Sequence, residues 1–122
     1  MKRILIAEDD EILYGILSYL IKEDLCIEEI EIIHVTSIAE ALTHLNSHDS
    51  FSFIMTDGDL KDGTADKIIR AMNEDQKHVC IIYSNNLSFI ENNQTKVRAA
   101  FEKSTVSPKM VMSSIKNYFF AN

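Results

Sequence analysis

The chain has 122 residues, of which 46% are hydrophobic and 25% charged, values close to those of an average globular protein. One compact domain over residues 1–122 accounts for this length, and the composition excludes a disordered chain. Nineteen acidic residues against 12 basic ones give a net charge of −7. This balance argues against a nucleic-acid binder, because such a protein needs a basic face to neutralise phosphates.

The apolar runs are too short to span a bilayer, and the N-terminal segment turns acidic after four apolar residues, unlike a signal peptide. Two cysteines, Cys26 and Cys80, lie in separate apolar runs and form neither a disulfide framework nor a metal knuckle. We expect both to be core thiols in a reducing compartment. The sequence therefore predicts a soluble, cytoplasmic protein without a membrane partner.

Five short apolar runs predict five strands along the chain. Most of them are rich in β-branched residues and do not alternate with polar ones, as in strands that are buried on both faces. The expected strands span residues 4–7, 30–35, 51–56, 79–83 and 97–101, the last at a sheet edge.

A helix is expected after each strand. Apolar residues recur at helical spacing over residues 12–21, 38–45, 65–72 and 110–119, whereas residues 85–96 predict only a short or irregular helix. Asp10 is the expected N-cap of the first helix, and Ser37 with Glu40 forms a capping box for the second. Ser107 as N-cap and Pro108 at the first helical position begin the last helix.

This order of elements predicts an α/β fold, a five-stranded parallel sheet wound on both faces in a (βα)5 arrangement. In such folds the functional crevice lies at the carboxyl ends of the strands. Polar residues follow four of the predicted strands there: Glu8 and Asp9; Asp57 and Asp59; Ser84; and Lys103.

Several carboxylates within a few ångström repel one another, and oxygen ligands of this kind suit Mg²⁺. Without metal, Asp9→Asn or Asp57→Asn is therefore expected to raise the melting temperature. A lysine and a hydroxyl beside a cation-bound carboxylate supply what a phosphoryl group needs, namely donors for its oxygens and charge neutralisation.

These strand ends together resemble a response-regulator receiver domain of two-component signalling, which has a flavodoxin-like fold. The matching segments are residues 4–10, 53–63, 81–84 and 101–103, so that the resemblance extends over essentially the whole chain. It implies that Asp57 is the phospho-acceptor, that Glu8 and Asp9 hold Mg²⁺, that Asp59 offers its backbone carbonyl to the metal, that Ser84 is the switch hydroxyl and that Lys103 contacts the phosphoryl group.

The resemblance implies a signalling module rather than an enzyme. Its phosphoryl donor would be a sensor histidine kinase or a phosphotransfer protein, its target another protein, and no DNA-binding output domain is expected. One alternative is a pseudo-receiver, an interaction module with the same fold but no phosphate switch. The other is a phosphatase of the haloacid-dehalogenase type, because Asp57, Gly58 and Asp59 resemble its DxD motif.

Three positions depart from the receiver pattern. Ser104 replaces the proline that usually follows the lysine, so we expect a trans Lys103–Ser104 peptide bond and a re-aimed lysine. Asn85 replaces a small residue and is expected to crowd or hydrogen-bond the phosphoryl site. Ala100 replaces an aromatic residue, so the usual aromatic switch is missing. The segment between Ser84 and Lys103 is also shorter than usual, and these differences favour the pseudo-receiver alternative.

Overall fold

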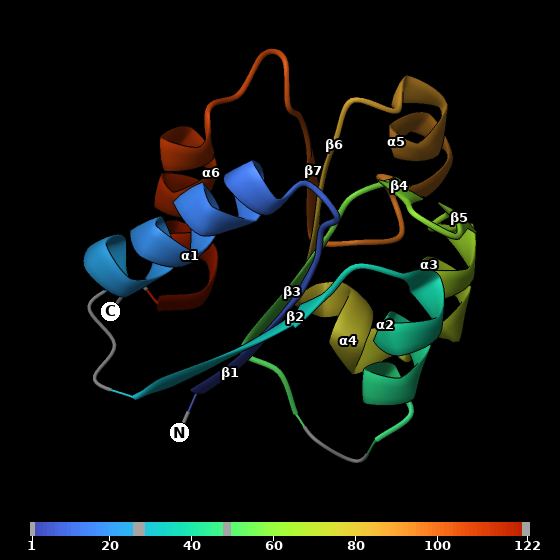
Figure 1. Ribbon diagram of the computed structural model, residues 1–122, viewed down its shortest axis with the longest axis horizontal. Coiled ribbons are helices and arrows are strands. Elements are labelled where there is room, and N and C mark those ends of the chain that lie inside the picture. The colour runs from blue at the N-terminus through green and yellow to red at the C-terminus, as the bar shows by residue number, and fades with distance from the viewer. Residues whose placement is uncertain (1, 26–28, 48–49, 121–122) are drawn as a thin grey trace.

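The computed structural model describes residues 2–25, 29–47 and 50–120 (Figure 1). Five strands form one sheet in the order β2-β1-β3-β6-β7, and every neighbouring pair is parallel. Their bounds are β1 (Lys2–Ala7), β2 (Ile30–Val35), β3 (Phe53–Thr56), β6 (Cys80–Ser84) and β7 (Ala99–Glu102). The five predicted strands are thus confirmed, and β7 is an edge strand as expected.

Helices cover both faces of this sheet. The five that follow the strands are α1 (Glu11–Asp24), α2 (Ile38–Leu45), α3 (Asp66–Ala71), α5 (Leu87–Asn93) and α6 (Pro108–Ile115). One face carries α1 and α6, and the opposite face carries α2, α3 and α5 (Figure 1). The doubly wound α/β fold predicted from the sequence is confirmed.

The run at the centre of β1 explains why the pattern does not alternate. Ile4 and Ile6 belong to the apolar cluster beneath α1 and α6, whereas Leu5 belongs to the cluster beneath α2 and α3. Successive side chains of a strand point to opposite faces, so a strand covered on both faces needs apolar residues throughout. Burial of each such side chain contributes about 1.5–3 kcal/mol.

Side-chain caps fix two helix starts as predicted. Asp10 Oδ1 accepts from the backbone N–H of Ile12 at 3.0 Å and of Leu13 at 3.1 Å, at the start of α1. Ser107 Oγ accepts from Met110 N–H at 3.3 Å, ahead of a proline in the first turn of α6. These bonds satisfy amides that have no acceptor within the helix.

The capping box of α2 is only half correct. Ser37 Oγ accepts from Glu40 N–H at 3.1 Å, as predicted. The Glu40 carboxylate, however, accepts from Thr36 N–H at 3.3 Å and from the Thr36 and Ser37 hydroxyls, where the box would have it bind Ser37 N–H. These bonds hold the pKa of Glu40 below its ordinary value.

Three elements were not predicted: the hairpin strands β4 (Asp59–Leu60) and β5 (Gly63–Thr64) and the short helix α4 (Glu74–His78). The helix predicted over residues 110–119 is α-helical only to Ile115 and continues as a π-helical turn, η1 (Lys116–Phe120). Asp62 lies in the hairpin turn, and its carboxylate accepts from Ile38 N–H at 2.7 Å and Ala39 N–H at 3.2 Å. The backbone bond from Ile38 lowers the pKa of Asp62. The hairpin therefore caps α2 across the fold.

Two further expectations concern thiols and membranes. Cys80 is buried in β6, and burial raises the pKa of its thiol to about 12, whereas Cys26 lies outside the described residues. Within the described ranges, no helix combines the length and the apolar character needed to cross a bilayer.

Candidate functional site

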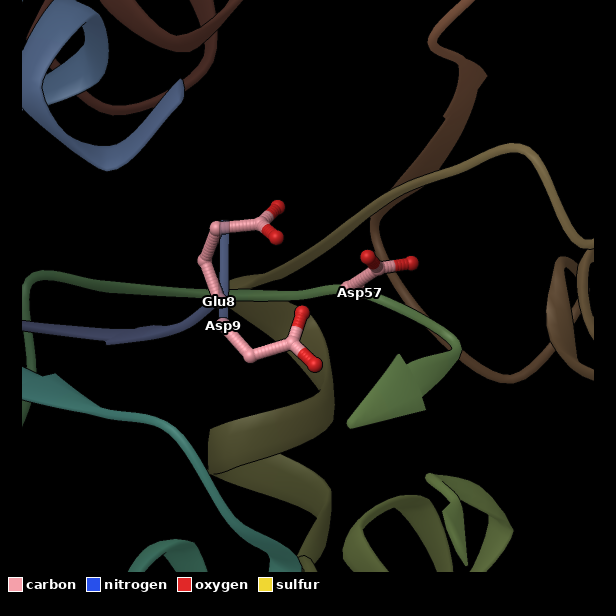
Figure 2. Close-up of side chains that lie close together, drawn as sticks. All are labelled: Glu8, Asp9 and Asp57. Carbon is pink, nitrogen blue, oxygen red and sulfur yellow. The ribbon is translucent and has the colours of Figure 1, made fainter. Parts of the chain in front are cut away.

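Three carboxylates meet at the carboxyl edge of the sheet (Figure 2). Glu8 and Asp9 follow β1, and Asp57 follows β3, which is the neighbouring strand. One oxygen of each lies within 4.8 Å of the others. Glu8 and Asp57 are 3% and 9% exposed, whereas Asp9 is open to solvent.

This oxygen set fits a magnesium ion. Mg²⁺ binds oxygens at about 2.0–2.1 Å in an octahedron, so its ligands lie about 3 Å apart when adjacent and about 4 Å apart when opposite. Glu8, Asp9 and Asp57 each offer one oxygen within 4.8 Å of the other two, so the three could bind one ion together. Asp59, two residues after Asp57, lies in β4, and the role of its backbone carbonyl as a metal ligand stays a prediction.

Lys103 joins the two buried carboxylates. Its Nζ lies 2.7 Å from Asp57 Oδ2 and 2.8 Å from Glu8 Oε1. The expectation of a re-aimed lysine is therefore wrong, although no peptide bond of the described residues is cis, as expected for Ser104. Burial alone would lower the pKa of the Lys103 amine, but the bonds to Asp57 and Glu8 outweigh it and raise that pKa.

The environment of Glu8 disfavours the charged form of its carboxyl group. Burial raises the pKa of its carboxyl above the ordinary value, and the charge of Asp57 adds to this effect. The bond from Lys103 and one from Asp10 N–H, at 3.1 Å, oppose it without cancelling it. The acidic cluster is thus only partly compensated by the lysine.

Ser84 completes the predicted set through a shared amide. It is the last residue of β6 and is fully buried. The N–H of Gly58 donates both to Asp57 Oδ1 at 2.6 Å and to Ser84 Oγ at 3.2 Å. The hydroxyl therefore lies beside the Asp57 carboxylate, and Asn86 N–H donates to the same hydroxyl oxygen at 3.0 Å.

Phe89 borders this site, and its place there was not predicted from the sequence. A Cβ atom on Gly58 would lie 2.7 Å from Phe89 Cδ2, so only glycine leaves room for the ring. Phe89 is 2% exposed, and Ala100 packs against the same apolar cluster. The apolar patch within residues 87–90 was the available signal, but its partner was not evident.

Two asparagines tie the neighbouring loops together. Asn86 Oδ1 accepts from Phe89 N–H at 3.0 Å, and its Nδ2 donates to Asp59 Oδ1 at 3.0 Å. Asn85 Oδ1 accepts from Ser104 N–H at 2.9 Å. Asn85, expected to crowd or hydrogen-bond the phosphoryl site, thus has its side-chain oxygen engaged with another loop.

The loop after β1 is braced from behind. His34 Nε2 donates to the backbone carbonyl of Glu8 at 2.7 Å. Its ring stacks on Tyr14, with ring centroids 3.5 Å apart. These contacts fix the backbone that presents Glu8 and Asp9.

Solved structures with the same arrangement of strands and helices match nearly the whole length of this chain. The non-phosphorylated HemR receiver domain from Leptospira biflexa has a TM-score of 0.78 and 18% identity, covering 100% of this chain and 97% of its own. A CheY-like response regulator receiver domain protein from Methanospirillum hungatei JF-1 has a TM-score of 0.71 and 21% identity, over 98% and 94%. A response regulator receiver protein from Sinorhizobium medicae WSM419 has a TM-score of 0.76 and 18% identity, over 98% and 95%.

Sequence comparison adds nothing to this likeness, since no family model and no curated protein matches the chain. At such low identities the structural likeness establishes the fold alone. That fold is the one predicted from the strand-end motifs.

Proposed function

We propose that this chain, which has the fold of response-regulator receiver domains, is a single receiver domain that accepts a phosphoryl group on Asp57 in a Mg²⁺-dependent reaction in the cytoplasm. The donor is a histidine kinase or a phosphotransfer protein. The observation that carries the proposal is the convergence of five side chains from four strand ends: Glu8, Asp9, Asp57, Ser84 and Lys103.

The reaction is a transfer between a nitrogen and a carboxylate oxygen. An Asp57 oxygen forms a bond to phosphorus while the bond from phosphorus to the donor imidazole breaks, and that bonding pair stays on the imidazole nitrogen. Glu8, Asp9 and Asp57 would hold the metal, which supplies charge neutralisation for the phosphoryl oxygens.

Lys103 and Ser84 supply the remaining donors. The Lys103 amine already bonds to Asp57 at 2.7 Å, so a phosphoryl group on that carboxylate would lie within its reach. The Ser84 hydroxyl accepts amide bonds and therefore has its own proton free to donate to a phosphoryl oxygen. Both groups would stabilise the negative charge of the phosphoryl oxygens that Asp57 receives from the donor.

A protein donor is supported by the helix beside the site. α1 begins two residues after Asp9, and three large apolar residues of α1 are exposed: Ile12, Ile16 and Tyr19. Such side chains stabilise a protein contact more than they would the approach of a small, charged phosphate donor.

Intact-mass measurement after incubation with acetyl phosphate and Mg²⁺ tests the proposal. One phosphoryl group should be added to the unaltered chain and none to Asp57→Asn, because an amide is a poor nucleophile and cannot form the acyl phosphate. Asp62→Asn, which removes a carboxylate that caps α2, is the matched control and should be labelled normally.

Three other outcomes would contradict the proposal. Labelling of Asp57→Asn would place the acceptor elsewhere. Metal binding by titration calorimetry without any labelling, also with a phosphorylated phosphotransfer protein as donor, would favour the pseudo-receiver. Turnover of p-nitrophenyl phosphate would favour the phosphatase, although its motif usually follows a first strand and Asp57 follows β3 here.

A further inference from the structure

The loop that carries Lys103 is held by three consecutive residues at the end of β6. The three bonds run from the Tyr83 hydroxyl to the Val106 carbonyl at 2.6 Å, from Lys103 N–H to the Ser84 carbonyl at 3.0 Å, and from Ser104 N–H to Asn85 Oδ1 at 2.9 Å. Two of them bind the loop at Lys103 itself and at the next residue.

The Asn85 bond lies just beyond the end of the sheet ladder. Strands β6 and β7 pair up to Ser84 and Glu102, and Lys103 N–H then donates to a backbone carbonyl. For the next amide, that of Ser104, the acceptor is a side chain. A proline at position 104 has no N–H and could not make this bond. Two positions that depart from the receiver pattern thus form one contact.

We propose that Asn85 is a positioning residue for Lys103: by binding Ser104 N–H, it holds the loop so that the lysine amine stays at Asp57 and Glu8. The proposal rests on the proposed function for its catalytic consequence, because Lys103 matters to the reaction only if Asp57 is phosphorylated.

The physical reason is the flexibility of lysine. Its four-carbon stem loses side-chain entropy when the amine is fixed, and an unanchored backbone would add to that loss. Here the Lys103 amine bonds to two carboxylates. The backbone amides of Lys103 and of the next residue, Ser104, are hydrogen-bonded as well. The following turn is closed as well, since Thr105 and Val106 donate to the Glu102 carbonyl at 3.1 and 3.0 Å.

Hydrogen exchange of the Ser104 amide tests the contact directly. Asn85→Ala should speed this exchange about fivefold relative to the unaltered chain, the factor expected for one net hydrogen bond. Asn85→Asp keeps an acceptor oxygen and should restore slow exchange. Asn92→Ala, an exposed asparagine of α5, is the matched control and should leave Ser104 unaffected.

The consequence for Lys103 has two readouts. The ¹⁵N relaxation of its ammonium group should show greater motion in Asn85→Ala than in the unaltered chain, without metal or phosphate present. Asn85→Ala should also slow labelling by acetyl phosphate about fivefold, but should have no further effect in a Lys103→Ala chain, because residues that act through each other are not additive.

Equal Ser104 exchange in Asn85→Ala and in the unaltered chain would overturn the proposal. So would an Asn85→Ala effect on labelling of the same size with and without Lys103, since that is what a merely structural role predicts. If the unaltered chain takes no phosphoryl group, the proposed function fails, while amide exchange and ammonium relaxation still decide the positioning role.

Discussion

Gly58 matters to the site because it has no side chain. A Cβ there would lie 2.7 and 2.8 Å from two Phe89 ring atoms and 3.0 Å from Ser84 Oγ. We expect Gly58→Ala to lower the free energy of unfolding by about 1–3 kcal/mol, the cost of overpacking a buried site. Urea denaturation measures the change.

Two variants make this prediction specific. Gly15→Ala is the control, because a Cβ at this position meets nothing within 4 Å. This substitution should stabilise α1 by about 0.5–1 kcal/mol. Adding Phe89→Leu to Gly58→Ala should recover part of the loss, since the smaller side chain relieves the contact. Full additivity of the two changes would contradict the proposed clash.

Glu8 predicts a pH dependence of stability. Burial raises the pKa of Glu8 above 4.5, so between that value and the higher folded one the folded protein holds more protons than the unfolded chain. Its contribution to the free energy of unfolding therefore falls as pH rises through this window. In Glu8→Gln that fall is absent, so the variant should gain on the unaltered protein from pH 4.5 towards neutrality.

Urea denaturation of metal-free protein at several pH values measures this difference. Glu91→Gln, on exposed α5, is the matched control for loss of a carboxylate. A difference between Glu8→Gln and the unaltered chain that stays constant with pH would show that Glu8 does not cause the dependence.

At the scale of single elements, α5 is the segment best placed to respond to phosphorylation. Asn86 caps it, Phe89 anchors it beside Gly58, and Ser84 lies three positions before its first residue. Ala100 has no ring to follow a moving hydroxyl, so we expect beryllofluoride with Mg²⁺ to change hydrogen exchange mainly within residues 84–96. A large change across residues 97–101 and α6 would instead indicate a conventional receiver switch.

Element types were predictable where burial dictates the pattern. The apolar runs gave all five parallel strands, each overlapping its predicted range, because strands covered on both faces have no polar alternative. α4 has a capping box, formed by Asn73 and Gln76, that the sequence analysis overlooked. The β4–β5 hairpin has no comparable signal, since strands of two residues depend on tertiary contacts.

The site was predictable as a set of strand ends, but its contacts were not. Parallel strands place their carboxyl ends at one edge, which is enough to gather Glu8, Asp57 and Lys103. The bond from Ser104 to Asn85 joins positions 19 apart, and the cap from Asp62 joins positions 24 apart. Such pairings depend on loop geometry, which no local pattern in the sequence records.

At the scale of the whole molecule, part of the net charge of −7 comes from the carboxylates of Glu8, Asp9 and Asp57, which lie together at one edge of the sheet. Without Mg²⁺, Asp9→Asn should raise the melting temperature. The free energy of unfolding should increase by about 1 kcal/mol or less, the repulsion energy of two like charges about 4 Å apart in water. The same gain is no longer expected for Asp57→Asn, because Lys103 would lose an ion-pair partner.

Calorimetric scans with and without Mg²⁺ check this prediction. The order should reverse at saturating metal, because binding to the folded state stabilises the unaltered protein more. A lower melting temperature of Asp9→Asn without metal would show that Asp9 makes a net favourable contribution.

The strand order also has a consequence for folding kinetics. Asp9 and Asp57 are 48 positions apart and meet only when β1 and β3 have paired in parallel. Parallel pairing over such separations is slow, and we expect the acidic residues to remain apart until the transition state has passed. Repulsion within the cluster would then act on the unfolding barrier alone. Asp9→Asn should slow unfolding in stopped-flow measurements and leave the refolding rate nearly unchanged.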